Sequence, residues 1–80
     1  MTVRVTVLLF AQLRLAADRS RLELDLPDGA TVRTAADRLE REIGAALTGS
    51  MCAVNERYAA PATSLADGDV VAFLPPVSGG

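Results

Sequence analysis

The sequence lacks several of the side chains on which enzyme active sites depend. It contains no histidine, no lysine and no tryptophan, and its one cysteine is Cys52. A histidine-based triad, a histidine–cysteine zinc site and an intramolecular disulfide are therefore excluded within one chain. No side chain can form a Schiff base or accept an isopeptide bond, because all eight basic residues are arginine. We expect no bound cofactor and no metal in this chain.

Charge and hydropathy exclude two further classes of partner. The net charge is −2 and no basic run is present, which argues against nucleic acid as a partner. The apolar run 7–11 is far too short to cross a bilayer, so no membrane is expected. The first residues lack the order of a signal peptide, and we expect a cytoplasmic protein. The length of 80 residues fits one small domain.

Periodicity predicts four strands and one main helix. Apolar residues alternate with polar ones over 3–9 and 22–26, which is typical of strands with one buried face. Thr31 is a candidate N-cap, Gly44 fits the end of the helix, and the stripe between them predicts a helix. That stripe consists of Val32, Ala36, Leu39 and Ile43. Apolar runs at 51–54 and 70–74 predict a buried third strand and a central last strand.

These elements predict an α+β protein, with a mixed sheet and one main helix packed across one of its faces. Their order is that of the β-grasp, or ubiquitin-like, fold. We expect residues 1–74 to form the β-grasp domain and residues 75–80 to form an extended tail. The segment 45–66 gives the weakest signals, because an alanine-rich stretch surrounds Pro61.

The last six residues have an order that suits delivery of a terminal carboxylate. Pro75 and Pro76 each fix φ near −65° and favour a stiff, outward-pointing start. Gly79 and Gly80 have no Cβ atom and can enter a passage too narrow for other residues. The five residues from Pro76 to Gly80 reach roughly 17 Å when extended. We therefore expect this tail to place the carboxylate of Gly80 in the active site of another protein.

Four segments resemble the small subunit of molybdopterin synthase, a family of ubiquitin-like sulfur carriers. The most specific is Phe-x-Pro-Pro-Val-x-Gly-Gly at the end of the chain, which follows an Asp-Gly-Asp turn at 67–69. A Gly-Gly pair alone is weak, since every ubiquitin-like carrier has one. The chain departs from the family after Arg14, where Leu15–Asp18 stand near a position that often holds glycine. The four segments are Val7–Arg14, Ala53–Asn55, Leu65–Phe73 and Phe73–Gly80.

The resemblance implies a sequence of reactions at Gly80. An adenylyltransferase that resembles ubiquitin-activating enzymes would use ATP to form an adenylate on its carboxylate. A persulfide donor would then displace AMP and leave a thiocarboxylate. That sulfur would attack cyclic pyranopterin monophosphate in the large synthase subunit, and two transfers would build the dithiolene of molybdopterin. Gly80 is thus a covalent sulfur donor, and the catalytic side chains are expected on the large subunit, with which the family forms a heterotetramer.

A second set of candidate residues concerns partner binding. If Val5, Val7 and Leu9 face the helix, Phe10 faces the opposite side of the sheet. The same alternation in the last strand places Leu74 on that opposite side. Tyr58, the only tyrosine, could join them. The resemblance implies partner contact by these positions and by the tail, and aromatic anchors commonly dominate interface energy. The candidates are Phe10, Tyr58, Leu74, Pro75, Pro76, Val77, Ser78 and Gly79.

Other conspicuous residues favour structural roles. Cys52 lies within an apolar strand and fits a small buried hydrophobe better than a sulfur relay. Asp67 and Asp69 flank a glycine and fit turn formers better than metal ligands. Two other functions share the terminal chemistry: a sulfur carrier for thiamine thiazole or tRNA thiolation, and a protein modifier that forms isopeptide bonds. The Pro-Pro-Val-Ser segment before Gly-Gly favours the molybdopterin pathway.

Overall fold

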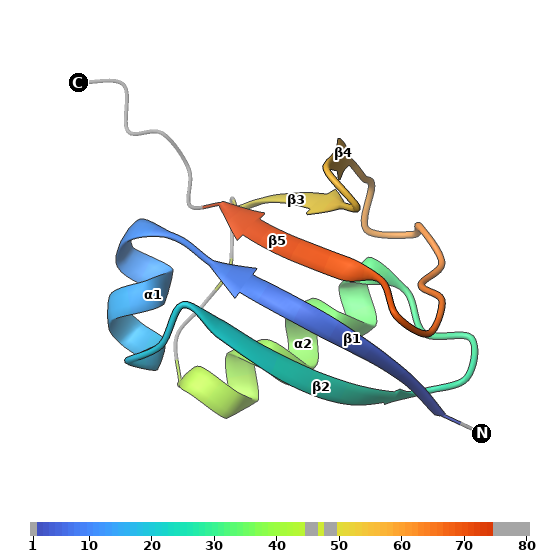
Figure 1. The fold of residues 1–80 in the computed structure, drawn as a ribbon, viewed down its shortest axis with the longest axis horizontal. Helices are drawn as coiled ribbons and strands as arrows, with labels where there is room; N and C mark the ends of the chain where they lie inside the picture. Colours follow the sequence, from blue (N-terminus) through green and yellow to red (C-terminus); the bar gives the residue numbers. More distant parts are fainter. Residues whose placement is uncertain (1, 45–46, 48–49, 75–80) are drawn as a thin grey trace.

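A five-stranded mixed sheet carries one long helix across one face and a short helix at one end (Figure 1). The computed structural model describes residues 2–44, 47 and 50–74. The α+β, ubiquitin-like architecture expected from the sequence is confirmed. In chain order the elements are β1 (Thr2–Leu9), α1 (Ala11–Ala17), β2 (Arg21–Pro27), α2 (Val32–Ile43), β3 (Met51–Val54), β4 (Arg57–Tyr58) and β5 (Val70–Leu74).

The strand order is β2-β1-β5-β3-β4, so the first and last strands of the chain lie side by side in the middle of the sheet. β1 and β5 run parallel, with Leu8 opposite Ala72, whereas the β1–β2, β3–β5 and β3–β4 pairs are antiparallel. The expected central position of the last strand is confirmed. Because β5 is paired on both sides, the residue at its end, Leu74, has a fixed position in the sheet.

The core lies between the sheet and α2. Val5 and Val7 of β1 are fully buried, as are Ala35 and Leu39 of α2 and Val71 of β5. The alternation expected for β1 is therefore confirmed, with its odd-numbered residues facing the helix. The helical stripe is also confirmed, although Ala36 is half-buried and the adjacent Ala35 is fully buried.

Helix α2 begins and ends as the sequence predicted. The Thr31 side chain accepts a hydrogen bond from the Thr34 backbone amide, and Thr34 Oγ1 accepts one from the Thr31 amide at 3.1 Å. This reciprocal capping box satisfies amides that have no partner within the helix. At the other end Gly44 has φ 69°, a left-handed conformation that suits glycine.

Two elements were absent from the sequence prediction. Helix α1 follows β1 directly, and its end is capped by Asp18 in a left-handed conformation with φ 57°. Asp18 thus adopts a backbone conformation that is most common for glycine. The other addition is β4, a two-residue strand on the outer edge of β3. Within the described residues no helix is both long and apolar enough to span a bilayer.

Candidate functional site

The sheet face opposite α2 carries the candidate functional residues. Side chains alternate between the two faces of each strand, and residues paired across strands share a face. Val71 and Phe73 of β5 are buried and point toward α2, as do the residues paired with them in β1 and β3. The intervening residues of β5 therefore point to the opposite side of the sheet. We call this side the open face. Its apolar half consists of Leu8, Phe10, Met51, Ala53, Tyr58, Val70, Ala72 and Leu74.

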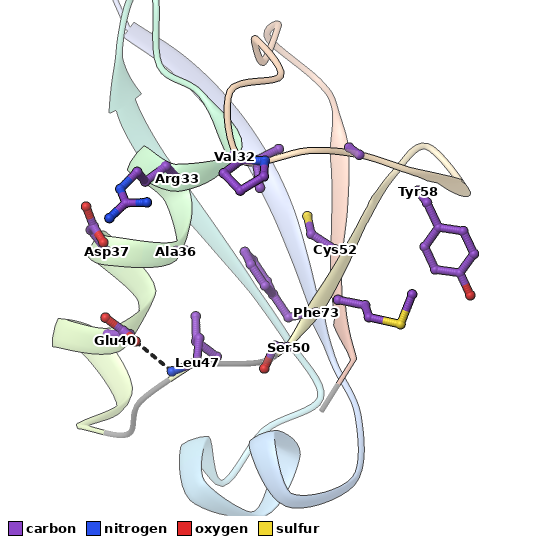
Figure 2. A pocket seen from close by; sticks show the side chains of 13 residues that line it. Val32, Arg33, Ala36, Asp37, Glu40, Leu47, Ser50, Cys52, Tyr58 and Phe73 are labelled. Atoms are coloured by element: carbon purple, nitrogen blue, oxygen red, sulfur yellow. Dashed lines mark hydrogen bonds between the residues drawn. The ribbon is translucent and has the colours of Figure 1, made fainter. Parts of the chain in front are cut away.

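The structure brings Phe10, Tyr58 and Leu74 to this same face, as strand alternation predicted for Phe10 and Leu74. Phe10 is 44% exposed and Tyr58 is 74% exposed, whereas Leu74 is half-buried. Figure 2 shows Cys52 and Phe73 pointing toward α2 while Tyr58 points away from it. Their joint placement makes a contact surface of three large apolar side chains. Their role in partner binding stays a prediction.

Sequence reasoning missed Met51 as a member of this surface. Met51 pairs with Leu74 across β3 and β5, and its side chain is 48% exposed. A signal was present, because Cys52 was expected in the core and Met51 is the adjacent residue in the same strand. Methionine is flexible and adapts its shape to its neighbours, which suits an exposed apolar surface.

The other half of the open face is charged and lies on β1 and β2. Arg4 Nε donates to Asp25 Oδ1 at 2.8 Å, and the two residues pair directly across the strands. This hydrogen bond lowers the pKa of the Asp25 carboxyl below its usual value. Glu23, the next outward-facing residue of β2, pairs with Thr6 and is exposed. The open face is thus divided into an apolar region near the tail and a polar region farther from it.

A groove of about 470 Å³ crosses β5 on the apolar half. Its floor lies at Ala72 and Val70, because the alanine side chain is much smaller than those around it. Leu8 and Phe10 border one side, and the Asn55–Glu56 turn borders the other. The groove therefore begins at the end of β1 and reaches the connection between β3 and β4.

Asn55 fastens that connection to the start of β5. Its amide nitrogen donates to Asp69 Oδ1 at 3.0 Å, and its amide oxygen accepts from the Val70 backbone at 3.0 Å. Asp69 Oδ2 also accepts from the Ala66 amide, and Asp67 Oδ1 accepts from the Arg4 amide. Both aspartates therefore act on backbone groups, which confirms the expectation that they form the turn.

Cys52 lies on the opposite side of the sheet, at the edge of a hollow of about 540 Å³ between α2 and β3 (Figure 2). Its side chain is buried, and burial raises the pKa of the thiol to about 11 from its usual 9.0. The thiolate is the nucleophilic form, so the thiol is unreactive near neutral pH. The expectation that Cys52 is a small core residue is confirmed.

The same hollow contains polar groups from α2 and the following loop. Glu40 Oε2 accepts a hydrogen bond from the Leu47 amide at 2.6 Å, which attaches Leu47 to the helix (Figure 2). Arg33 and Asp37 also line the hollow. Among the described residues, no group of three histidine, cysteine, aspartate or glutamate side chains is arranged to hold a metal ion.

The expected tail residues lie outside the described residues. These are Pro75, Pro76, Val77, Ser78, Gly79 and Gly80. The structure does show where they begin, since β5 ends at Leu74 beside Met51 on the apolar half of the open face. The sequence places six residues between that point and the last carboxylate.

The sheet order, the helix across one face and the apolar open face define a ubiquitin-like β-grasp protein. Residues 7–80 match the ThiS family. The chain is 35% identical to the molybdopterin synthase sulfur carrier subunit of Mycobacterium tuberculosis, over 98% of this chain and 99% of that protein. The chain therefore belongs to the ThiS family of ubiquitin-like sulfur carriers, and it is of the molybdopterin synthase type.

Solved structures show the same relationship. A protein from Pyrococcus furiosus assigned as molybdopterin converting factor subunit 1 matches with a TM-score of 0.83 and 32% identity, over 94% of this chain and 99% of that one. The small archaeal modifier protein 1 of Haloferax volcanii matches with a TM-score of 0.84 and 27% identity, over 94% and 99%. The fold is thus shared by a protein named as a molybdopterin converting factor subunit and by one named as a modifier.

Proposed function

We propose that this chain donates sulfur from a thiocarboxylate on Gly80 during molybdopterin synthesis. The observation that carries the proposal is the position at which the last strand ends. The central strand β5 ends at Leu74, beside Met51 and on the same face as Phe10 and Tyr58. A partner that binds the apolar half of the open face would therefore also receive the residues that follow Leu74.

The proposed chemistry begins with activation of the carboxylate. A free carboxylate is a poor electrophile because its leaving group would be oxide. Attack of the Gly80 carboxylate on the α-phosphate of ATP releases pyrophosphate and forms an acyl adenylate. The AMP of this adenylate is a good leaving group. A persulfide sulfur then displaces AMP, and cleavage of the resulting acyl disulfide by a thiol leaves the thiocarboxylate. Gly80 contributes a covalent sulfur donor to the reaction.

The partners of the proposal are a molybdopterin synthase large subunit and an adenylyltransferase related to ubiquitin-activating enzymes. The side chains of this protein support the proposal that its partners supply the catalytic groups. Its thiol is buried and protonated near neutral pH, and the chain contains no histidine or lysine. The large subunit would supply the groups that bind cyclic pyranopterin monophosphate and move protons. ATP would be bound by the activating enzyme.

A second candidate function is protein modification through an isopeptide bond to Gly80. The likeness to the archaeal modifier favours this candidate, because that protein shares the fold over nearly its whole length. Both functions begin with the same adenylate and differ in the nucleophile that attacks it. A sulfur atom gives a carrier, and the amine of a lysine gives a conjugate.

Reconstitution tests the proposal. The thiocarboxylated chain is mixed with a molybdopterin synthase large subunit and cyclic pyranopterin monophosphate, and molybdopterin is measured by fluorescence of its oxidised derivative. The proposal predicts product in proportion to the thiocarboxylate supplied. Absence of product, together with support of thiazole or tRNA thiolation, would assign the chain to another pathway. Conjugates to lysines without sulfur transfer would assign it to the modifiers.

A further inference from the structure

The turn between β3 and β4 holds a charged residue in an unfavourable backbone conformation. Asn55 has φ 50° and Glu56 has φ 70°, so both lie in the left-handed region. Asparagine tolerates this region, whereas the second position of such a hairpin turn usually holds glycine. A left-handed conformation is unfavourable for a residue with a Cβ atom, because the Cβ comes too close to the following carbonyl oxygen. Local folding therefore does not explain the glutamate at this position.

The position of Glu56 relates it to the groove on the open face. Glu56 lines this groove together with Leu8, Phe10, Val70 and Ala72. The residue is exposed, and no ion pair joins its carboxylate to any cation among the residues that the structure describes. The side chain of its neighbour Asn55 is already engaged, because its amide nitrogen donates a hydrogen bond to Asp69 and its amide oxygen accepts one from Val70. Asn55 is therefore less available than Glu56 for a polar contact with a ligand.

We infer that this groove receives an arginine or lysine side chain of the partner that docks on the open face, with its cationic head at Glu56. The groove is apolar along its floor and negatively charged at one end, and long basic side chains have the matching order of an apolar stem and a charged head. Adjacent strands are about 4.8 Å apart, so the span from β1 across β5 to the β3–β4 turn suits such a side chain.

The inference rests on the proposed function and adds to it the chemistry of the partner's contact residue. Other charges on the open face are less suited to this role. Asp25 is already paired with Arg4, and Glu23 lies in β2, outside the groove. Glu56 is therefore the carboxylate at which an incoming cation would find both a charge and an apolar passage.

Binding of the intact chain to a purified molybdopterin synthase large subunit tests this inference. Titration calorimetry compares the unsubstituted chain with Glu56→Gln, which removes the charge but retains size and the strained turn. We expect affinity to fall about 3- to 10-fold at low ionic strength. The difference should shrink above roughly 0.5 M salt, where exposed charges are screened. The matched control is Glu23→Gln, which changes net charge equally on the same sheet face and should alter affinity less than 2-fold.

A second variant separates binding from folding. Glu56→Gly removes the carboxylate, and glycine adopts the left-handed conformation without strain. The melting temperature of this variant should therefore not fall, whereas its affinity for the large subunit should fall as much as that of Glu56→Gln. Equal affinity of Glu56→Gln and the unsubstituted chain would overturn the inference. An equal loss in Glu23→Gln would also overturn it, because the effect would then be one of net charge. If the unsubstituted chain fails to bind the large subunit, the proposed partner itself is wrong.

Discussion

Met51 lies directly opposite Leu74 in the antiparallel pair of β3 and β5, so an exposed methionine borders the residue from which the tail begins. This pair places the apolar half of the open face next to the last described residue of the chain. Because Leu74 belongs to a strand paired on both sides, its position relative to the apolar half of the open face is fixed. Docking of the body and entry of the tail can then reinforce one another.

Substitution of Leu74 tests this coupling. Leu74→Glu would place an unpaired charge in the interface and should weaken binding of the large subunit by about 2–5 kcal/mol. The side chain is half-buried in the free protein, and we expect a loss of stability of only about 1 kcal/mol. Titration calorimetry gives the affinity, and thermal unfolding of the free variant gives the stability.

Leu15→Glu is the control for this substitution. Leu15 lies in α1, is 79% exposed and takes no part in the apolar half of the open face. It should leave affinity within about 2-fold of the unsubstituted chain. Unchanged affinity of Leu74→Glu for the large subunit would rule out the apolar half of the open face as the binding surface. A loss of several kcal/mol of stability would instead show that Leu74 belongs to the core.

Removal of Asn55 should destabilise the protein. Asn55→Ala loses two side-chain hydrogen bonds and places alanine at φ 50°, and we expect a decrease of about 2–3 kcal/mol in the free energy of unfolding. Asn55→Gly loses the same bonds but accepts the backbone conformation, so it should lose less. Urea unfolding distinguishes the two. If Asn55→Ala is as stable as the unsubstituted chain, the hydrogen bonds of Asn55 do not stabilise the connection between β3 and β4 against the start of β5.

The buried thiol makes a prediction about pH. The pKa of Cys52 is raised to about 11 in the folded protein from a usual 9.0, so between these values the unfolded chain releases a proton that the folded one retains. The contribution of this group to stability should therefore decrease as the pH rises from about 9 to about 11. Cys52→Ala should remove that part of the pH dependence while retaining sulfur transfer. Loss of transfer in a folded Cys52→Ala variant would reopen the case for a sulfur relay.

The sequence predicted the elements that have strong periodicity. β1, β2 and α2 are long enough for their burial pattern to repeat several times, and Thr31 and Gly44 mark both ends of α2. The short helix α1 was missed because it has seven residues, no side-chain cap at Phe10 and no acidic residue in its first turn. β4 was missed because two exposed residues carry no periodic signal, and Glu56 replaces the glycine that would indicate a hairpin.

The site was predictable where alternation determines it. Phe10 and Leu74 follow from the parity of two strands whose core residues are evident, and Tyr58 was placed by its proximity to β3. The groove was not predictable, because it depends on the parallel pairing of Leu8 with Ala72, residues that are 64 positions apart. Sequence patterns describe each strand separately, whereas the small side chain at Ala72 becomes a groove floor only once its neighbours in the sheet are known.

Deletion of Gly80 tests the terminal chemistry separately from the fold. The shortened chain should unfold at the same temperature as the full chain, because the last strand ends at Leu74. It should lose sulfur transfer, since the carboxylate would then be one residue, or roughly 3.5 Å, short of its site. Full transfer by the deletion variant would contradict the assignment of Gly80 as the sulfur-bearing residue.

The most direct measurement is the intact mass of the chain before and after reaction with the large subunit and cyclic pyranopterin monophosphate, with molybdopterin measured in parallel. We expect the isolated carrier to be heavier by one sulfur-for-oxygen exchange at Gly80. This increment should disappear as molybdopterin forms, with two carriers consumed for each molecule of product. Product formation without loss of the increment, or loss of the increment without product, would show that Gly80 is not the source of the sulfur in molybdopterin.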